Sequence, residues 1–403
     1  MRLFSSLKHR PFALLWSGQS ISRLGDSLYR IALAWWVLEK TGSATAMGTV
    51  LIFSFTPMLL FLLIGGVAVD RFHRLGLMLT SDLLRGGVVA VVALLASSGR
   101  MEIWHVYVAS ILFGFVDAFF QPAYTAAVPQ LTPSELLLSA NSLTSLSGQL
   151  VNVIGPGLGA FIVALGDTPT AFALDALSFF ISAGCLVPLL RLPTTPRLET
   201  RRANVLRDVR EGIGTVLASP WLWISITIAG LANMTQVGPV AVALPFLIND
   251  HLQLDVGALG LAQSMHSIGA IAVAVWLGRL TRIRRRGLLA YGTWVAGGLI
   301  TVGIGLSVSI VEVGLAMLLL GAAYSVCGLI WTNTLQELVP RDMLGRVSSI
   351  DYLGSFVLLP VGFGLTGWAT DQWGTPLVFI IGGLLTAGLA ALGLLHPGVR
   401  RLD

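Results

Sequence analysis

Long runs of apolar residues alternate with short polar turns along nearly the whole chain. Several runs exceed the roughly 18 residues that a helix needs to cross a bilayer. Because the hydrocarbon core offers no water to peptide groups, each run should be helical. The pattern predicts twelve membrane spans: 12–38, 46–69, 77–97, 104–128, 136–165, 170–190, 220–248, 256–280, 288–308, 311–338, 344–370 and 374–396.

Composition agrees with a membrane protein. The 403 residues are 55% apolar and only 11% charged, whereas soluble domains are about a quarter charged. The 45 glycines indicate close helix packing and bends. Cys185 and Cys327 lie in apolar runs of different halves, so we expect no disulfide, metal site or cofactor.

Lysine and arginine predict the orientation. Of the 25 basic residues, all but four fall on one side of the predicted spans. Arg85 is counted on this basic side. The other side has only Lys40 and Arg100, while Arg23 and Arg30 lie inside the first span. The basic side of a membrane protein is cytoplasmic. We therefore expect both termini in the cytoplasm, in an inner (cytoplasmic) membrane, and we attribute the net charge to topology rather than to nucleic-acid binding.

The longest loop, 191–219, divides the chain. It begins with Pro193 and Pro196 and continues as a basic amphipathic stretch, which predicts a helix lying against lipid headgroups. The predicted organisation is a six-helix bundle (1–190), a linker (191–219) and a second six-helix bundle (220–403).

The two halves resemble each other weakly. LWSGQSISRLGD in the first span aligns with LWISITIAGLAN in the seventh, which places Asp26 opposite Asn233. Pro129 and Pro340 each precede a polar turn and a new helix at matching places. A duplicated six-helix unit follows, and transporters built this way bind substrate between the halves, near mid-membrane.

The loop after the second span reads Gly66-x-x-x-Asp70-Arg71-x-x-Arg74, with His73 before the last arginine. It resembles the signature loop of the major facilitator superfamily, G-x-x-x-D-R-x-G-R-R. The resemblance implies an all-α membrane fold of two pseudo-symmetric six-helix bundles. It also implies that Asp70 latches the outward-facing state at the start of helix 11, where a helix N-terminus stabilises a carboxylate. The alternative is that the arginines only mark the cytoplasmic side.

The fifth span contains Gly155-Pro156-x-x-Gly159, which resembles the antiporter motif of exporters. Proline frees a backbone carbonyl, and glycines permit a kink and a close helix contact. The alternative is a kinked packing helix.

Longer stretches such as FALLWSGQSISRLGDSLYRIALAWWVL and LVPRDMLGRVSSI resemble the macrolide-efflux and enterobactin-exporter branch of the superfamily. That resemblance implies export of drugs or siderophores.

Polar residues recur on single faces of several predicted spans. An ionisable group inside a bilayer costs a few kcal/mol, so it should face a cavity or a partner. The family resemblance implies that helices 1, 4, 7 and 10 line a central cavity, which would suit an amphipathic or cationic molecule. The candidate site residues are Arg23, Asp26, Arg30, Asp117, Gln121, Tyr124, Asn233, Gln236, Tyr324, Trp331 and Asn333.

Asp117 and Asp26 are the candidates for proton coupling. Burial favours the protonated carboxyl and neighbouring arginines favour the carboxylate, so conformation can switch the balance. Asp117 is the first choice because its own helix offers no basic neighbour. Asp26 is second, since Arg23 and Arg30 lie three and four residues away and can pair with it locally. The alternative for Asp26 is a permanent structural network.

The sequence therefore predicts a proton-coupled antiporter that exports small amphipathic compounds such as macrolides by alternating access. We expect a monomer whose other partners are protons and membrane lipids. The alternatives are an exporter or flippase of a siderophore or lipid-like metabolite, an uptake transporter, and a membrane sensor or enzyme. An enzyme is not expected, because H-E-x-x-H, G-x-S-x-G and Walker A motifs are absent from the sequence.

Overall fold

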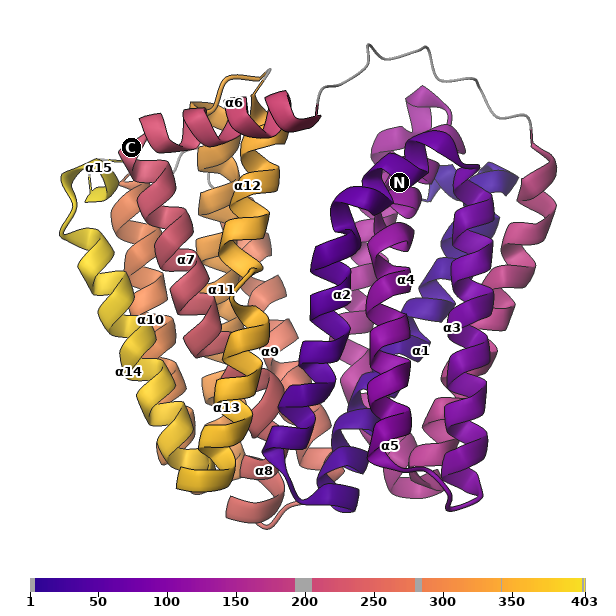
Figure 1. Cartoon of the computed structure of the whole chain (residues 1–403), viewed down its shortest axis with the longest axis horizontal. Helices are drawn as coiled ribbons and strands as arrows, with labels where there is room; N and C mark the ends of the chain where they lie inside the picture. The colour runs from indigo at the N-terminus through magenta and orange to yellow at the C-terminus, as the bar shows by residue number, and fades with distance from the viewer. Residues whose placement is uncertain (1–3, 193–204, 280–284, 342, 401, 403) are drawn as a thin grey trace. The chain divides into compact units, whose positions relative to one another are not determined.

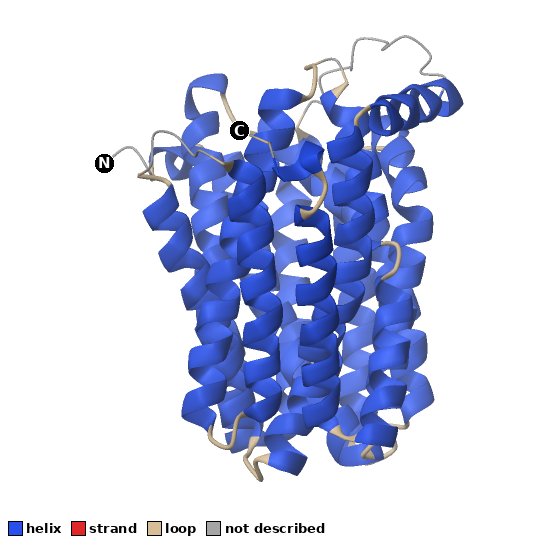
Figure 2. Ribbon diagram, turned by 90° about the vertical axis from the view of Figure 1, so that its left-hand side faces the viewer, coloured by secondary structure: helices blue, strands red, loops and turns tan. Residues whose placement is uncertain are grey.

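The chain is helical wherever it is described. The computed structural model describes residues 4–192, 205–279, 285–341, 343–400 and 402. Figure 2 shows helices and short loops, and no strand occurs among these residues. The all-α fold expected from the apolar runs is confirmed.

Five long helices make up the first part of the chain (Figure 1). The fifth holds both the fifth and the sixth predicted spans, because the chain turns at Asp167, where φ is 67°. Short 3-10 turns lie at Ser5–Lys8, Ser134–Leu136 and Val187–Arg191. The helices are α1 (Arg10–Thr41), α2 (Ala44–Arg71), α3 (Arg74–Ser97), α4 (Ile103–Gln130) and α5 (Leu137–Leu186).

The remaining helices follow the predicted spans with two interruptions. π-helical turns at Pro239–Ala243 and Leu247–His251 extend the seventh span around α8, and the eleventh span breaks before Pro360 into α12 and α13. Proline explains both, because it removes a helical hydrogen bond. The helices are α6 (Val205–Ala218), α7 (Pro220–Gly238), α8 (Leu244–Phe246), α9 (Val256–Leu277), α10 (Arg286–Leu306), α11 (Ile310–Leu338), α12 (Leu344–Phe356), α13 (Leu359–Trp373), α14 (Thr375–Leu394) and α15 (Pro397–Arg400).

Ten helical segments of the described chain are long and apolar enough to cross a membrane. The segment around α5 counts once although it contains two predicted spans. Helix α1 is not among the ten, which fits the polar face formed by Arg23, Asp26 and Arg30. The structure is thus consistent with twelve spans.

The helices form two compact units. The first comprises Met1–Pro196 with Asp255–Ser264, and the second comprises Arg197–Leu254 with Met265–Asp403. In the first unit α5 packs against α1 and α3, and α2 packs against α4. In the second unit α10 packs against α11 and α14, α7 packs against α12 to α14, and α6 lies across α12 (Figure 1). A membrane-surface role for the linker helix stays a prediction.

Glycines bring α2 and α4 into backbone contact. A Cβ atom on Gly65 would overlap the backbone carbonyl of Ala118, and one on Gly114 would overlap that of Ser54. Neither position tolerates a side chain unless the helices move apart. This reciprocal contact fixes the position of α4, which carries Asp117.

The second unit repeats this contact between α9 and α11. A Cβ atom on Gly269 would overlap the Leu318 carbonyl, and one on Gly321 would overlap that of His266. Small residues at helix crossings are the usual device for close packing in membranes. The second and fourth spans of each half therefore pack by the same contact, as a duplicated unit requires.

We expect Gly114→Ala to destabilise the protein. The added methyl group meets a backbone carbonyl, and overpacking of this kind costs about 1–3 kcal/mol, more than the helix propensity gained from alanine. Thermal unfolding in detergent measures the effect. Gly87→Ala on α3 is the control, because its Cβ meets nothing within 4 Å. Equal melting temperatures for the two variants would contradict the packing argument.

Candidate functional site

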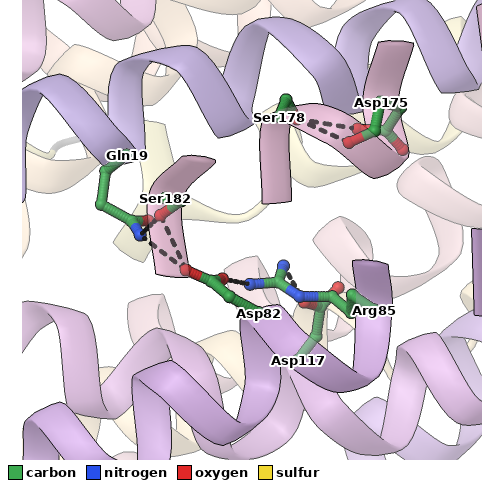
Figure 3. A network of polar contacts seen from close by, with 7 residues as sticks. All are labelled: Gln19, Asp82, Arg85, Asp117, Asp175, Ser178 and Ser182. Carbon is green, nitrogen blue, oxygen red and sulfur yellow. Dashed lines mark hydrogen bonds and ion pairs between the residues drawn. The ribbon is translucent and has the colours of Figure 1, made fainter. Parts of the chain in front are cut away.

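A buried arginine lies between two carboxylates in the first unit (Figure 3). Arg85 on α3 contacts Asp82 Oδ1 through Nη2 at 2.9 Å and Asp117 Oδ1 through Nη1 at 3.2 Å. Its guanidinium carbon lies 4.2 Å from the ring centre of Phe120 and 4.7 Å from that of Phe179. Aromatic faces attract a cation, so both rings and both acids hold Arg85 inside the helix bundle.

Asp82 is the more buried partner of this arginine. Its side chain is fully buried, and its Oδ2 accepts hydrogen bonds from Ser182 Oγ at 2.7 Å and Gln19 Nε2 at 3.4 Å. Gln19 Nε2 also lies 2.8 Å from Ser182 Oγ. Donors from α1, α3 and α5 therefore contact both carboxylate oxygens of Asp82.

Asp117 has a different environment. Arg85 is its only hydrogen-bonding or ion-pair partner in the described part of the chain. Its side chain is 32% exposed, compared with 5% for that of Arg85. Asp117 is therefore the more exposed carboxylate of this pair.

Asp26 does not form the local ion pairs considered from the sequence. No nitrogen of Arg23 or Arg30 lies within 4 Å of its carboxylate oxygens in the described structure, and Arg30 is exposed. Arg23 instead stacks on Tyr124, at 4.9 Å from the ring centre. Arg23 and Tyr124 thus join α1 to α4, as part of the predicted set.

Asp175 is the fourth acid of this region. It is fully buried, accepts a hydrogen bond from Ser178 Oγ at 3.3 Å, and its Oδ2 has no partner among the described residues. Asp26, Asp82, Asp117 and Asp175 all lie within electrostatic range of Arg85. Of these four acids, Asp82 and Asp117 pair directly with Arg85.

Sequence reasoning missed the centre of this network. Arg85 was assigned to the cytoplasmic side with the loop arginines, but the structure places it within α3 and only 4% exposed. Asp82 was not singled out. The available signal was their i, i+3 spacing inside an apolar run. Gln121 is exposed and takes no part in the network.

The second unit contains a cavity of about 240 Å³. Four of the five predicted residues of this half line it: Asn233, Gln236, Tyr324 and Trp331. Asn233 Nδ2 donates a hydrogen bond to the Ser355 carbonyl at 3.0 Å, which holds α7 against α12. Asn333 is exposed and does not line this cavity.

The glycines of the predicted antiporter motif form the contact between α5 and α1. A Cβ atom on Gly155 would overlap the Ser27 side chain. One on Gly159 would lie 3.2 Å from Leu28 Cα and 3.3 Å from Ile31 Cβ. Pro156 is buried beside them. The motif therefore packs α5 on the helix that carries Arg23 and Asp26, and its link to export stays a prediction.

The signature loop is described only in part. Arg74 Nη1 donates to the Ala126 carbonyl at 3.3 Å and to Gln130 Oε1 at 3.4 Å, at the C-terminal end of α4. His73 accepts a hydrogen bond from the Gly76 amide through Nδ1 at 3.1 Å and caps α3, which explains a histidine in place of glycine. Arg71 is exposed. The side chain of Asp70 lies outside the described residues, so its gating role stays a prediction, as does that of Gly66.

Comparison with known proteins identifies relatives over almost the whole chain. The Major Facilitator Superfamily profile matches residues 15–359 and 229–401. Macrolide efflux protein A of Streptococcus pyogenes is 23% identical over 400 residues, covering 97% of each chain. The enterobactin exporter EntS of Shigella boydii is 28% identical over 396 residues, covering 95% of this chain and 93% of the relative.

Solved transporters share the fold. A POT family transporter in complex with a thioalcohol-conjugated peptide superposes with a TM-score of 0.75 at 14% identity, covering 96% of both chains. A bacterial homologue of the lysosomal transporter Spinster, inward-facing, gives 0.71 at 13% identity, covering 98% of both chains. At these identities the likeness concerns the fold alone.

We expect Arg85→Gln to destabilise the first unit strongly. It leaves Asp82 buried without its cation, and breaking a buried ion pair from one side costs about 3–5 kcal/mol. Unfolding in detergent measures the loss. Glu211→Gln, which removes the partly exposed ion pair of Glu211 with Arg346 at 2.7 Å, is the control and should cost less than about 1 kcal/mol. A loss for Arg85→Gln no larger than the control's would show that the network is not structural.

Proposed function

Because the chain belongs to the Major Facilitator Superfamily, we propose that it is a proton-coupled antiporter exporting small amphipathic compounds across the inner membrane. Transport rather than enzymatic activity follows from the family and from its exporter relatives. Two bundles that alternately open a site to each side of the membrane supply the mechanism, as in other transporters with repeated halves.

The contrast between Asp82 and Asp117 carries the proton coupling. Asp82 holds Arg85 at 2.9 Å, surrounded by donors, so the cation stays in place. Asp117 shares that cation at 3.2 Å, is partly exposed and has no other partner among the described residues. A change in access to Asp117 therefore changes the balance between its protonated and ionised forms. An antiporter needs one carboxylate with this property.

The second unit supports an amphipathic substrate. Its cavity is walled by Tyr324 and Trp331 and carries the amides of Asn233 and Gln236. Apolar walls with a few fixed polar groups are typical of sites for organic molecules. The relatives are named as exporters of a macrolide and of enterobactin, so these two compounds are the first candidates for transport.

Everted membrane vesicles test coupling and direction together. Respiration acidifies their interior, and an exporter carries added substrate inward while protons leave, which a pH-sensitive dye records. We expect release with wild-type protein on adding a macrolide, a lipophilic cation or enterobactin. We expect none with Asp117→Asn, because the amide cannot bind and release a proton. The compound that gives release identifies the substrate class.

Asp167→Asn is the matched control, since Asp167 is an exposed carboxylate at the turn inside α5. It should release protons as the wild type does. Release that survives in Asp117→Asn would move the coupling role to Asp26. Binding of a substrate by folded wild-type protein without any release would contradict proton antiport.

The cytoplasmic location of both termini has its own test. Alkaline phosphatase fused after Asp403 should be inactive and green fluorescent protein fused there should fluoresce, because the first needs the periplasm and the second the cytoplasm. Fusions at Gly99, in the predicted outer loop between α3 and α4, should give the opposite result. Phosphatase activity at the C-terminus would reverse the predicted topology.

A further inference from the structure

The cavity of the second unit is lined by α7, α10, α11 and α12. Five aromatic side chains form much of its wall: Tyr291, Trp294, Tyr324, Trp331 and Phe356. Its volume of about 240 Å³ lies just below the range of about 300–1,000 Å³ for sites of drug-sized ligands. It therefore has room for one small aromatic molecule or for one end of a larger one.

Asp351 gives this cavity an acidic side chain. It is the only carboxylate among the described lining residues, and neither lysine nor arginine is among them. Its oxygens accept hydrogen bonds from Trp331 Nε1 at 3.0 Å and Ser355 Oγ at 3.5 Å, which are neutral donors. Arg346 on the same helix is paired with Glu211 of α6. A carboxylate in a membrane helix is costly without a cation, and the lining supplies none.

Gln236 gives a second, independent indication that the cavity binds a ligand. Its side chain lines the cavity and the residue is 1% exposed. Its Nε2 lies 3.5 Å from Thr301 Oγ1, while its Oε1 is buried with no donor among the described residues. Buried acceptors almost always have a donor. The cavity thus has an acceptor for an N–H or O–H group as well as a carboxylate.

We propose that this cavity binds a protonated amine that carries an aromatic or apolar body. Asp351 is the counter-ion, Gln236 Oε1 accepts an N–H bond, and the rings hold the cation and the apolar body. Asp351 is a binding residue in this proposal. The proposal rests on the proposed function for its substrate class, but binding resides in the second unit and proton coupling in the first.

Equilibrium binding to the purified full-length protein tests the site. The probes are radiolabelled phenylbutylamine and phenylbutanol, which share one skeleton and differ in charge. We expect the amine to bind more tightly than the alcohol. Asp351→Asn should lower amine affinity about 10- to 100-fold, as for loss of a charge-assisted hydrogen bond, and should leave the alcohol unchanged. Asparagine still accepts the Trp331 hydrogen bond, so the cavity should keep its shape.

Gln236→Leu separates the hydrogen bond from the charge. It should weaken binding of the primary amine several-fold and leave phenylbutyl-trimethylammonium unchanged, because that cation has no N–H group. Thr301 Oγ1 keeps its own hydrogen bond to the Gly297 carbonyl at 2.9 Å, so the neighbouring turn should be retained.

Asp117→Asn distinguishes this proposal from the proposed function. It should bind the amine as the wild type does while losing proton release in vesicles. Equal amine affinity in wild type and Asp351→Asn would overturn the site. So would absence of amine binding in a wild-type protein that still exports another compound. If the amine binds through Asp351 but no added substrate causes proton release from vesicles, the binding site stands and only proton antiport is contradicted.

Discussion

A charge inside a bilayer must be neutralised by the protein itself, and the rest of the structure depends on this constraint. In the first unit this constraint gathers four helical segments around Arg85, with Asp82 as the fixed partner and Asp117 as the accessible one. Glycine contacts between α2 and α4 and between α5 and α1 keep those segments close enough for the ion pairs to form. Packing and charge are thus two aspects of one arrangement.

The two units apply the constraint differently. The first contains its own cation, Arg85, which pairs with Asp82 and Asp117, and a proton is the simplest species that can alter this pairing. The second has Asp351 in an aromatic cavity without a basic residue in its described lining, and in our proposal a protonated amine supplies the missing positive charge. A transporter with repeated halves can divide coupling and recognition in this way, because each half keeps the same packing while its polar residues diverge.

The sequence predicted the spans well because their length and apolar character follow directly from bilayer thickness. Helical spacing also placed Asp117, Arg23 and Tyr124 among the candidate residues, and in the structure Asp117 contacts Arg85 while Arg23 stacks on Tyr124. The sequence did not predict Arg85, because counting basic residues cannot distinguish a loop arginine from one that lies along a helix and is neutralised by another helix.

Trp331 and Asn333 were proposed together, but residues two apart on a helix point in nearly opposite directions, and only Trp331 lines the cavity. Asp351 could not be identified as a binding residue from the sequence, because only the tertiary fold shows which carboxylates lie without a neighbouring cation.

The central claim is that substrate changes the protonation of Asp117. Infrared difference spectroscopy of the purified protein in lipid measures this directly, because a protonated carboxyl has its own carbonyl stretching band. The account predicts a substrate-induced change in that band in the wild type and in Asp167→Asn, and its loss in Asp117→Asn. An unchanged difference band in Asp117→Asn would contradict the claim and place the proton on another carboxylate.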